Sequence, residues 1–158
     1  MKPLDLIKTA RRLAGPTSSR KPRQSDLKRA VSSAYYAMFH TLCQNCADCL
    51  IGTAGSARSA PAWRQAYRSV DHGYAKKQCG NKTVTPKFPK DIEDFANLFR
   101  TLQEERHLAD YDPSSRFTRT ETIEHIDAAE TAIKDFRSAP ISDRRAFAAW
   151  TAMQLRKS

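Results

Sequence analysis

Apolar side chains recur at helical spacing through the long segment between Leu27 and Leu50. The residues that keep this spacing are Leu27, Val31, Ala34, Tyr35, Met38, Phe39, Leu42, Cys46, Cys49 and Leu50. A period close to 3.6 residues places all of them on one side of an α-helix. Because Ser25 or Asp26 can cap its start, we predict a helix over residues 25–51 that serves as the spine of the fold.

The rest of the chain divides into shorter amphipathic segments separated by glycine and proline. We predict further helices over residues 3–14, 60–79, 90–111, 119–138 and 142–156. No segment alternates apolar and polar residues with the period of two that half-buried strands require. The predicted fold is therefore all-α: an up-and-down helical bundle of four to five core helices plus short terminal helices, in a single domain over residues 1–158.

Basic residues exceed acidic ones by 27 to 17, which gives a net charge of +10. Residues 1–30 hold nine basic and two acidic side chains, whereas residues 88–135 hold six and twelve. A basic surface attracts polyanions because each phosphate that it neutralises releases counterions. The charge favours RNA or a nucleotide as partner, although many basic proteins have no such role.

The first fifteen residues lack the continuous apolar stretch of a signal peptide, and the chain has no apolar run of about 18 residues. A cytoplasmic protein without a membrane partner is the expectation, and its cysteines should be reduced. On one helix, Cys43, Cys46 and Cys49 spread over about 120° and do not converge on a metal. We expect them to be small core residues, with no metal and no cofactor.

A charged residue stands on the apolar face of the helix predicted over 90–111. That face comprises Ile92, Phe95, Leu98, Phe99, Leu102 and Ala109. On a helical wheel Arg106 falls about 25° from the centre of this face. Asp110 follows at the spacing that joins a guanidinium to a carboxylate, and Tyr111 comes next. Either Arg106 and Asp110 form a structural ion pair, or Arg106 lines a groove or interface where its donors bind phosphate.

A second polar track runs along the predicted spine helix. It consists of Arg29, Ser33, Tyr36 and His40, which share one helical face. If this helix and the one carrying Arg106 are antiparallel neighbours, the two sets form one polar network. Arg29, Ser33 and Tyr36 are then candidates for substrate binding. His40 is either a structural histidine held by a hydrogen bond or an acid or base.

The common catalytic motifs are missing. The sequence has no G-x-S-x-G, no Walker loop and no G-x-G-x-x-G, which removes the usual hydrolase and nucleotide-loop explanations. His72, His107 and His125 are scattered along the chain and match no zinc spacing.

Two blocks of sequence carry a resemblance to a known family. Residues 28–40, KRAVSSAYYAMFH, lie on the long early helix, and residues 106–113, RHLADYDP, follow some seventy residues later. In this order and helical context they resemble the HEPN superfamily over roughly residues 23–137. The resemblance implies a four- to five-helix bundle that forms a homodimer, with the arginine motif of both protomers lining a shared cleft.

The same resemblance implies roles for individual residues. Ribonuclease members carry a histidine four to six residues after the arginine, and the pair promotes metal-independent cleavage of RNA through the 2′-hydroxyl. Here Tyr111 stands in that position, in the form Arg-x-x-Ala-Asp-Tyr. The resemblance thus assigns Arg106, Asp110 and Tyr111 to the catalytic site. A tyrosine pKa near 10 suits acid–base work poorly at neutral pH, so His40 or His107 is the expected substitute.

Two functions follow as expectations. The first is an RNA-directed HEPN-like protein, a metal-independent ribonuclease or an RNA binder of a toxin–antitoxin or defence system. The second is a non-catalytic dimerisation module that binds a nucleotide or docks onto a partner such as a minimal nucleotidyltransferase acting as antitoxin. A helical scaffold whose core arginine is salt-bridged is the third and plainest interpretation.

Overall fold

The computed structural model describes residues 2–16 and 21–157. Within these residues it has seven α-helices, one short 3-10 helix and no strand, which confirms the predicted all-α class. In chain order the elements are α1 (Pro3–Ala14), α2 (Gln24–Leu50), α3 (Ala60–Arg68), α4 (His72–Cys79), η1 (Thr85–Lys87), α5 (Lys90–Tyr111), α6 (Arg119–Arg137) and α7 (Ile141–Ala152).

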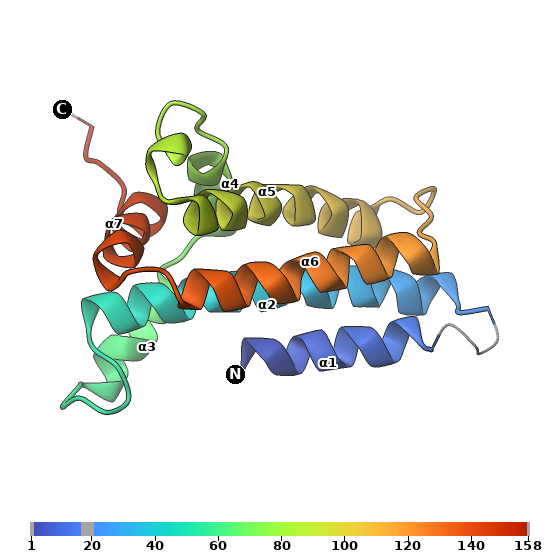
Figure 1. The fold of residues 1–158 in the computed structure, drawn as a ribbon, viewed down its shortest axis with the longest axis horizontal. Coiled ribbons are helices and arrows are strands. Elements are labelled where there is room, and N and C mark those ends of the chain that lie inside the picture. The colour runs from blue at the N-terminus through green and yellow to red at the C-terminus, as the bar shows by residue number, and fades with distance from the viewer. Residues whose placement is uncertain (1, 17–20, 158) are drawn as a thin grey trace.

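Four long helices, α1, α2, α5 and α6, run side by side along the long axis of the molecule (Figure 1). The helix α2 contacts each of the other three, so it is the spine that its length predicts. The helices α3, α4 and α7 gather at one end of this bundle. The arrangement confirms the helical bundle expected from the sequence.

A core of aromatic and aliphatic side chains fills the space between the helices. Phe95 of α5 has its ring centroid 4.4 Å from that of Phe136 on α6 and 6.2 Å from that of Phe147 on α7. All three are buried, and burial of one such side chain contributes about 1.5–3 kcal/mol. Tyr35 of α2 is also fully buried, and its hydroxyl therefore needs a partner inside the protein.

The helix predicted over 60–79 is in fact two helices, α3 and α4, separated just before His72. Asp71 is the N-cap of α4, and its carboxylate accepts a hydrogen bond from the backbone N–H of Tyr74 at 2.8 Å. Val70, immediately before the cap, is only 6% exposed, so the chain turns inward here. Apolar spacing does not reveal this break because it depends on what Val70 packs against.

The predicted caps of the spine helix are also wrong. The helix α2 begins at Gln24 after Arg23, and no side chain caps its start. The Gln24 side chain instead donates to the Phe117 carbonyl at 2.7 Å and accepts from the Phe117 N–H at 2.9 Å. This tertiary contact fixes the start of α2 to the segment before α6 and replaces the local cap expected from Ser25 or Asp26.

The last helix is shorter than the predicted range 142–156. It begins at Ile141, directly after Pro140, and ends at Ala152. Met153 and Leu155 are 51% and 89% exposed, so the apolar spacing continues where there is no surface to pack against. Helical spacing alone therefore overestimates the length of α7.

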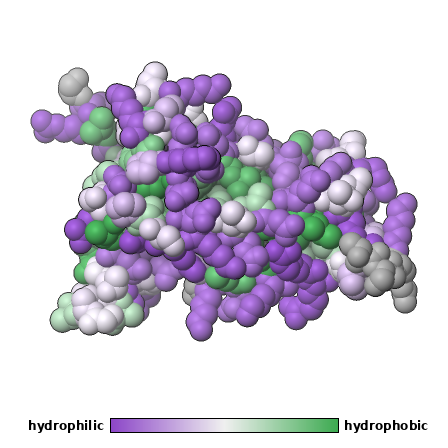
Figure 2. Space-filling view, in the orientation of Figure 1, coloured by the Kyte–Doolittle hydropathy of each residue, from purple (hydrophilic) through white to green (hydrophobic). Residues whose placement is uncertain are grey.

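The surface follows from the amphipathic helices. Hydrophilic residues cover most of the face in Figure 2, and apolar residues show between them. Among the described helices, none combines the length and the apolar character that crossing a membrane requires.

We expect Asp71→Ala to lower the free energy of unfolding by about 1 kcal/mol, because it removes the side-chain acceptor at the start of α4. Asp71→Asn keeps an oxygen in the same place and should stay close to wild type. Chemical denaturation measures both variants. Equal stability of the alanine variant and wild type would show that Asp71 does not set the start of α4.

Candidate functional site

Arg106 of α5 lies against two tyrosine rings of α2. Its guanidinium carbon is 5.2 Å from the ring centroid of Tyr35 and 5.4 Å from that of Tyr36. Only 12% of the Arg106 side chain is exposed. The negative faces of aromatic rings attract a cation, which explains how the bundle accommodates a charge on an otherwise apolar helix face.

The helices α2 and α5 are antiparallel neighbours, as the polar network requires. Lys28 Nζ donates to the carbonyl of Asp112 at 3.3 Å, and Ser32 Oγ donates to the carboxylate of Asp110 at 3.5 Å. Further along α2, Tyr36 contacts Arg106 of α5. The polar segments of the two helices therefore come together, with Ser32 in place of Ser33.

The ion pair between Arg106 and Asp110 is present but long. Arg106 Nη1 lies 3.5 Å from Asp110 Oδ2, the oxygen that Ser32 also contacts. Arg106 Nε is buried and has no hydrogen-bond partner among the described residues. A buried donor without a partner is uncommon in proteins and calls for an explanation, of which a functional role is one.

His72, at the start of α4, completes the cluster around the tyrosines. The Tyr35 hydroxyl and His72 Nδ1 are 2.6 Å apart. The imidazole also stacks on Phe39, with ring centroids 3.7 Å apart. Its centroid lies 5.7 Å from Tyr35 and 5.9 Å from Tyr36. His72 and Arg106 therefore contact the same two rings.

The surroundings keep this imidazole neutral. Burial lowers the pKa of His72 below its ordinary value of 6.5, and the positive charge of Arg106 lowers it further. Burial also raises the pKa of the Tyr35 phenol, against the opposing effect of Arg106, so the hydroxyl stays protonated. At neutral pH the cluster thus pairs a fixed cation with an uncharged imidazole, which can accept a proton.

The predicted polar track of α2 separates into different environments. His40 is half-buried and hydrogen-bonded through Nδ1 to the Tyr67 hydroxyl of α3. Burial lowers its pKa as well. Tyr36 joins Arg106, whereas Arg29 is exposed and Ser33 is half-buried.

His107 and Tyr111 form a separate pair at the end of α5. Their ring centroids are 5.0 Å apart, and Tyr111 is 66% exposed. His107 is exposed as well. Both side chains lie at the surface, whereas His72 contacts the rings of Tyr35 and Tyr36, and His40 contacts the ring of Tyr36.

The cysteines lie apart from this cluster as free thiols. Cys43 and Cys46 are buried, and burial raises the pKa of the Cys46 thiol to about 12. Among the described residues, no group of three or more His, Cys, Asp or Glu side chains is placed to hold a metal ion.

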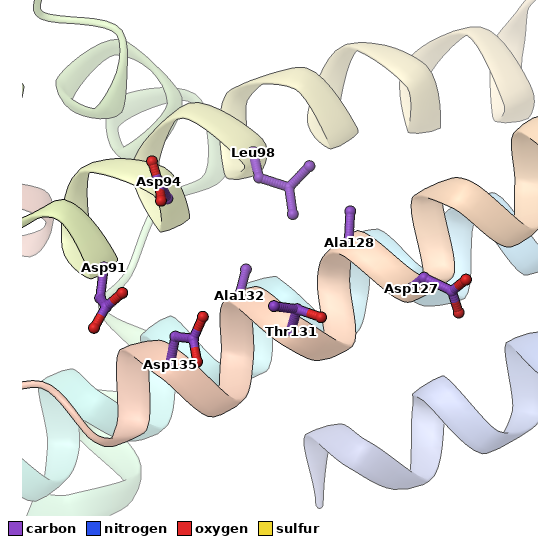
Figure 3. Close-up of a pocket in the computed structure, with 8 residues that line it drawn as sticks. All are labelled: Asp91, Asp94, Leu98, Asp127, Ala128, Thr131, Ala132 and Asp135. Atoms are coloured by element: carbon purple, nitrogen blue, oxygen red, sulfur yellow. The ribbon is translucent and has the colours of Figure 1, made fainter.

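A cavity of about 440 Å³ lies between α5 and α6, but it is acidic (Figure 3). Its lining residues are Asp91, Asp94, Leu98, Asp127, Ala128, Thr131, Ala132 and Asp135. None of them belongs to the cluster around Arg106. Four carboxylates repel a phosphate, so this cavity is a poor candidate for binding RNA.

Comparison with models of known protein families, with curated proteins and with solved structures finds no match to this chain. The sequence patterns predict Arg106, Asp110 and Tyr36 as members of one polar network but not Tyr35 and His72. Tyr35 follows the apolar spacing of the core, and His72 lies far from Arg106 in the chain, at the start of a helix that apolar spacing does not separate from α3.

We expect the free energy of unfolding to fall as the pH is lowered from about 7 to about 5. His40 and His72 have lowered pKa values in the folded protein, so the unfolded chain takes up protons first in this range. Their contribution to stability is complete above the unfolded pKa near 6.5 and is lost as the pH falls through the folded value.

Denaturation at a series of pH values measures this dependence. The double variant His40→Gln, His72→Gln should show a shallower slope than wild type, and the exposed His107→Gln should keep the wild-type slope. The same slope in the double variant would contradict the neutral state of the two imidazoles.

Proposed function

We propose that this chain is a metal-independent ribonuclease whose active site is built around Arg106 and His72. The observation that carries the proposal is that both groups contact the rings of Tyr35 and Tyr36. The two tyrosine rings thereby hold together a cation that can bind a phosphate and a neutral imidazole that can accept a proton. The resemblance to the HEPN superfamily calls for the same two chemical groups.

The reaction uses the 2′-hydroxyl of the RNA as nucleophile. His72 accepts the proton of this hydroxyl, whose oxygen attacks the adjacent phosphorus while the bond to the 5′-oxygen breaks. The departing 5′-oxygen takes a proton from solvent, which leaves a 2′,3′-cyclic phosphate and a 5′-hydroxyl. Arg106 stabilises the extra negative charge of the phosphorane, where a preorganised donor contributes most.

The step needs the His72 tautomer that carries its proton on Nδ1, because Nε2 then has the lone pair that takes the proton. In this tautomer Nδ1, which lies 2.6 Å from the Tyr35 oxygen, donates to that oxygen. The other expected histidines are less suited. His72 contacts the rings of both Tyr35 and Tyr36, whereas the contact of His40 with this pair is with Tyr36. His107 is exposed beside Tyr111. A His40→Ala variant that cleaves RNA at the full rate would remove His40 from the mechanism.

The biological setting follows from the resemblance. We place the ribonuclease in a toxin–antitoxin or defence system, as a homodimer whose two Arg106 sites line one cleft and whose partner is a nucleotidyltransferase antitoxin. The basic first part of the chain supports RNA as substrate, since Lys28 and Arg29 lie on α2 before Ser32.

A second candidate is the non-catalytic dimerisation module that binds a nucleotide or docks onto a partner. It is favoured by the end of α5, where Leu108 and Tyr111 are 41% and 66% exposed. Exposed apolar side chains beside the arginine motif suit a protein contact. In this function Arg106 binds without promoting cleavage.

We expect wild-type protein to cleave mixed single-stranded RNA in the presence of EDTA and Arg106→Ala to be slower by a factor of about 100 or more, because it lacks the donor at the phosphorane. Gel analysis of the products measures the rate. Arg100→Ala is the matched control, because Arg100 lies on the same helix, is 47% exposed and contacts Glu104.

Equal cleavage by wild type and Arg106→Ala would overturn the ribonuclease proposal. An absence of cleavage in both, together with RNA binding that weakens with salt, would favour the second candidate.

A further inference from the structure

A row of aromatic rings leads away from Arg106 along α2 and onto α3. The ring row comprises Tyr36, His40, Tyr67 and Trp63, and it begins where Arg106 meets Tyr36. The centroids of Tyr36 and His40 are 6.3 Å apart. Those of His40 and Tyr67 are 5.8 Å apart, and those of Tyr67 and Trp63 are 5.2 Å apart.

The ring row lies at the surface. All four of its members are half-buried, whereas core rings such as Tyr35, Phe95 and Phe99 are fully buried. Half-buried rings keep part of their faces available for a ligand with flat, apolar surfaces.

The far end of the ring row is held in place by an ion pair. Arg58 lies over the Trp63 ring, with its guanidinium carbon 4.6 Å from the centroid. Asp48 accepts from the Trp63 indole N–H at 2.9 Å and from Arg58 at 3.2 Å, which orients both groups. The indole is therefore fixed before any ligand arrives.

The chain around Trp63 has the charge that a phosphate backbone needs. Residues 49–70 contain Arg58, Arg64 and Arg68 and no Asp or Glu. Arg64 and Arg68 are exposed on α3, each directly after a member of the ring row. Rings for bases, interleaved with cations for phosphates, are the combination that binds single-stranded nucleic acid.

We propose that the ring row is a subsite for the unpaired nucleotides that flank the phosphate held by Arg106. Bases stack on Trp63 and Tyr67, and the backbone passes Arg64 and Arg68. The subsite extends the proposed ribonuclease site and rests on that function for its orientation toward Arg106. A paired duplex does not use it, because its bases are already stacked on each other.

The fluorescence of Trp63 tests the subsite directly. In the Trp150→Phe background Trp63 is the sole tryptophan. The probe is hexathymidylate, which lacks a 2′-hydroxyl and so cannot be cleaved by the proposed mechanism. We expect it to quench Trp63, whereas a fully paired duplex long enough to be stable and thymidine monophosphate, both at equal nucleotide concentration, should quench little. No quenching, or equal quenching by the duplex, would overturn the subsite.

Variants of Tyr67 test the stacking itself. Tyr67→Leu should weaken hexathymidylate binding by about 5- to 150-fold, because it removes one stacking ring. Tyr67→Phe loses the hydrogen bond to His40 but keeps the ring, and it should bind like wild type. Tyr74→Leu, on α4 and outside the ring row, is the matched control. Wild-type affinity in Tyr67→Leu would contradict the proposal. If Tyr67→Leu does not fold, the quenching of Trp63 in the Trp150→Phe protein decides.

The subsite and the ribonuclease activity can fail separately. His72→Asn should lose cleavage and keep the quenching of Trp63, because it removes the proton acceptor and no group that holds the phosphate or the bases. Cleavage without quenching overturns the subsite alone, and quenching without cleavage overturns the ribonuclease proposal alone.

Discussion

The contact of the Arg106 guanidinium with the rings of Tyr35 and Tyr36 is the interaction on which the site depends. It joins α5 to α2 at a position where helical spacing calls for an apolar side chain. A cation over an aromatic ring contributes about 0.5–2 kcal/mol, more when water is excluded. The ion pair with Asp110 is the alternative explanation. It is a single 3.5 Å contact with a carboxylate that is 32% exposed, and an ion pair that is open to water contributes about 0–1 kcal/mol. The rings therefore explain the burial of Arg106 better than its ion pair does.

Tyr35 and Tyr36 also connect Arg106 to a third helix, α4. Tyr35 is fully buried, and its hydroxyl bonds to His72 at the start of α4. A hydrogen bond of this kind contributes about 1 kcal/mol, while an unpaired buried hydroxyl costs about 1–3 kcal/mol. The hydrogen bond that gives the Tyr35 hydroxyl a partner thus also holds the His72 imidazole near Arg106. Burial and the charge of Arg106 together lower the pKa of His72. The packing of Tyr35 and the lowered pKa of His72 therefore depend on the same contact between α2 and α4.

Much of the fold is predictable from helical spacing, because α2 and α5 are long enough for their apolar faces to be unambiguous. Arg106 is identifiable for the same reason, since it breaks an otherwise regular face. His72 is not identifiable, because its role depends on the inward turn at Val70 and on a cap at Asp71 that splits the predicted helix over 60–79. The start of α2 shows the same limit, since Gln24 is held by Phe117 from a distant part of the chain.

The most direct test of the account is the turnover of single-stranded RNA by His72→Asn, measured in EDTA beside His107→Asn. Each variant removes one imidazole. His72 is in contact with Tyr35 and Tyr36, whereas His107 is at the surface. Loss of a general base lowers the rate by about 100- to 10,000-fold. We expect this loss for His72→Asn and a rate close to wild type for His107→Asn. Full activity of His72→Asn, or the loss in His107→Asn instead, would contradict it.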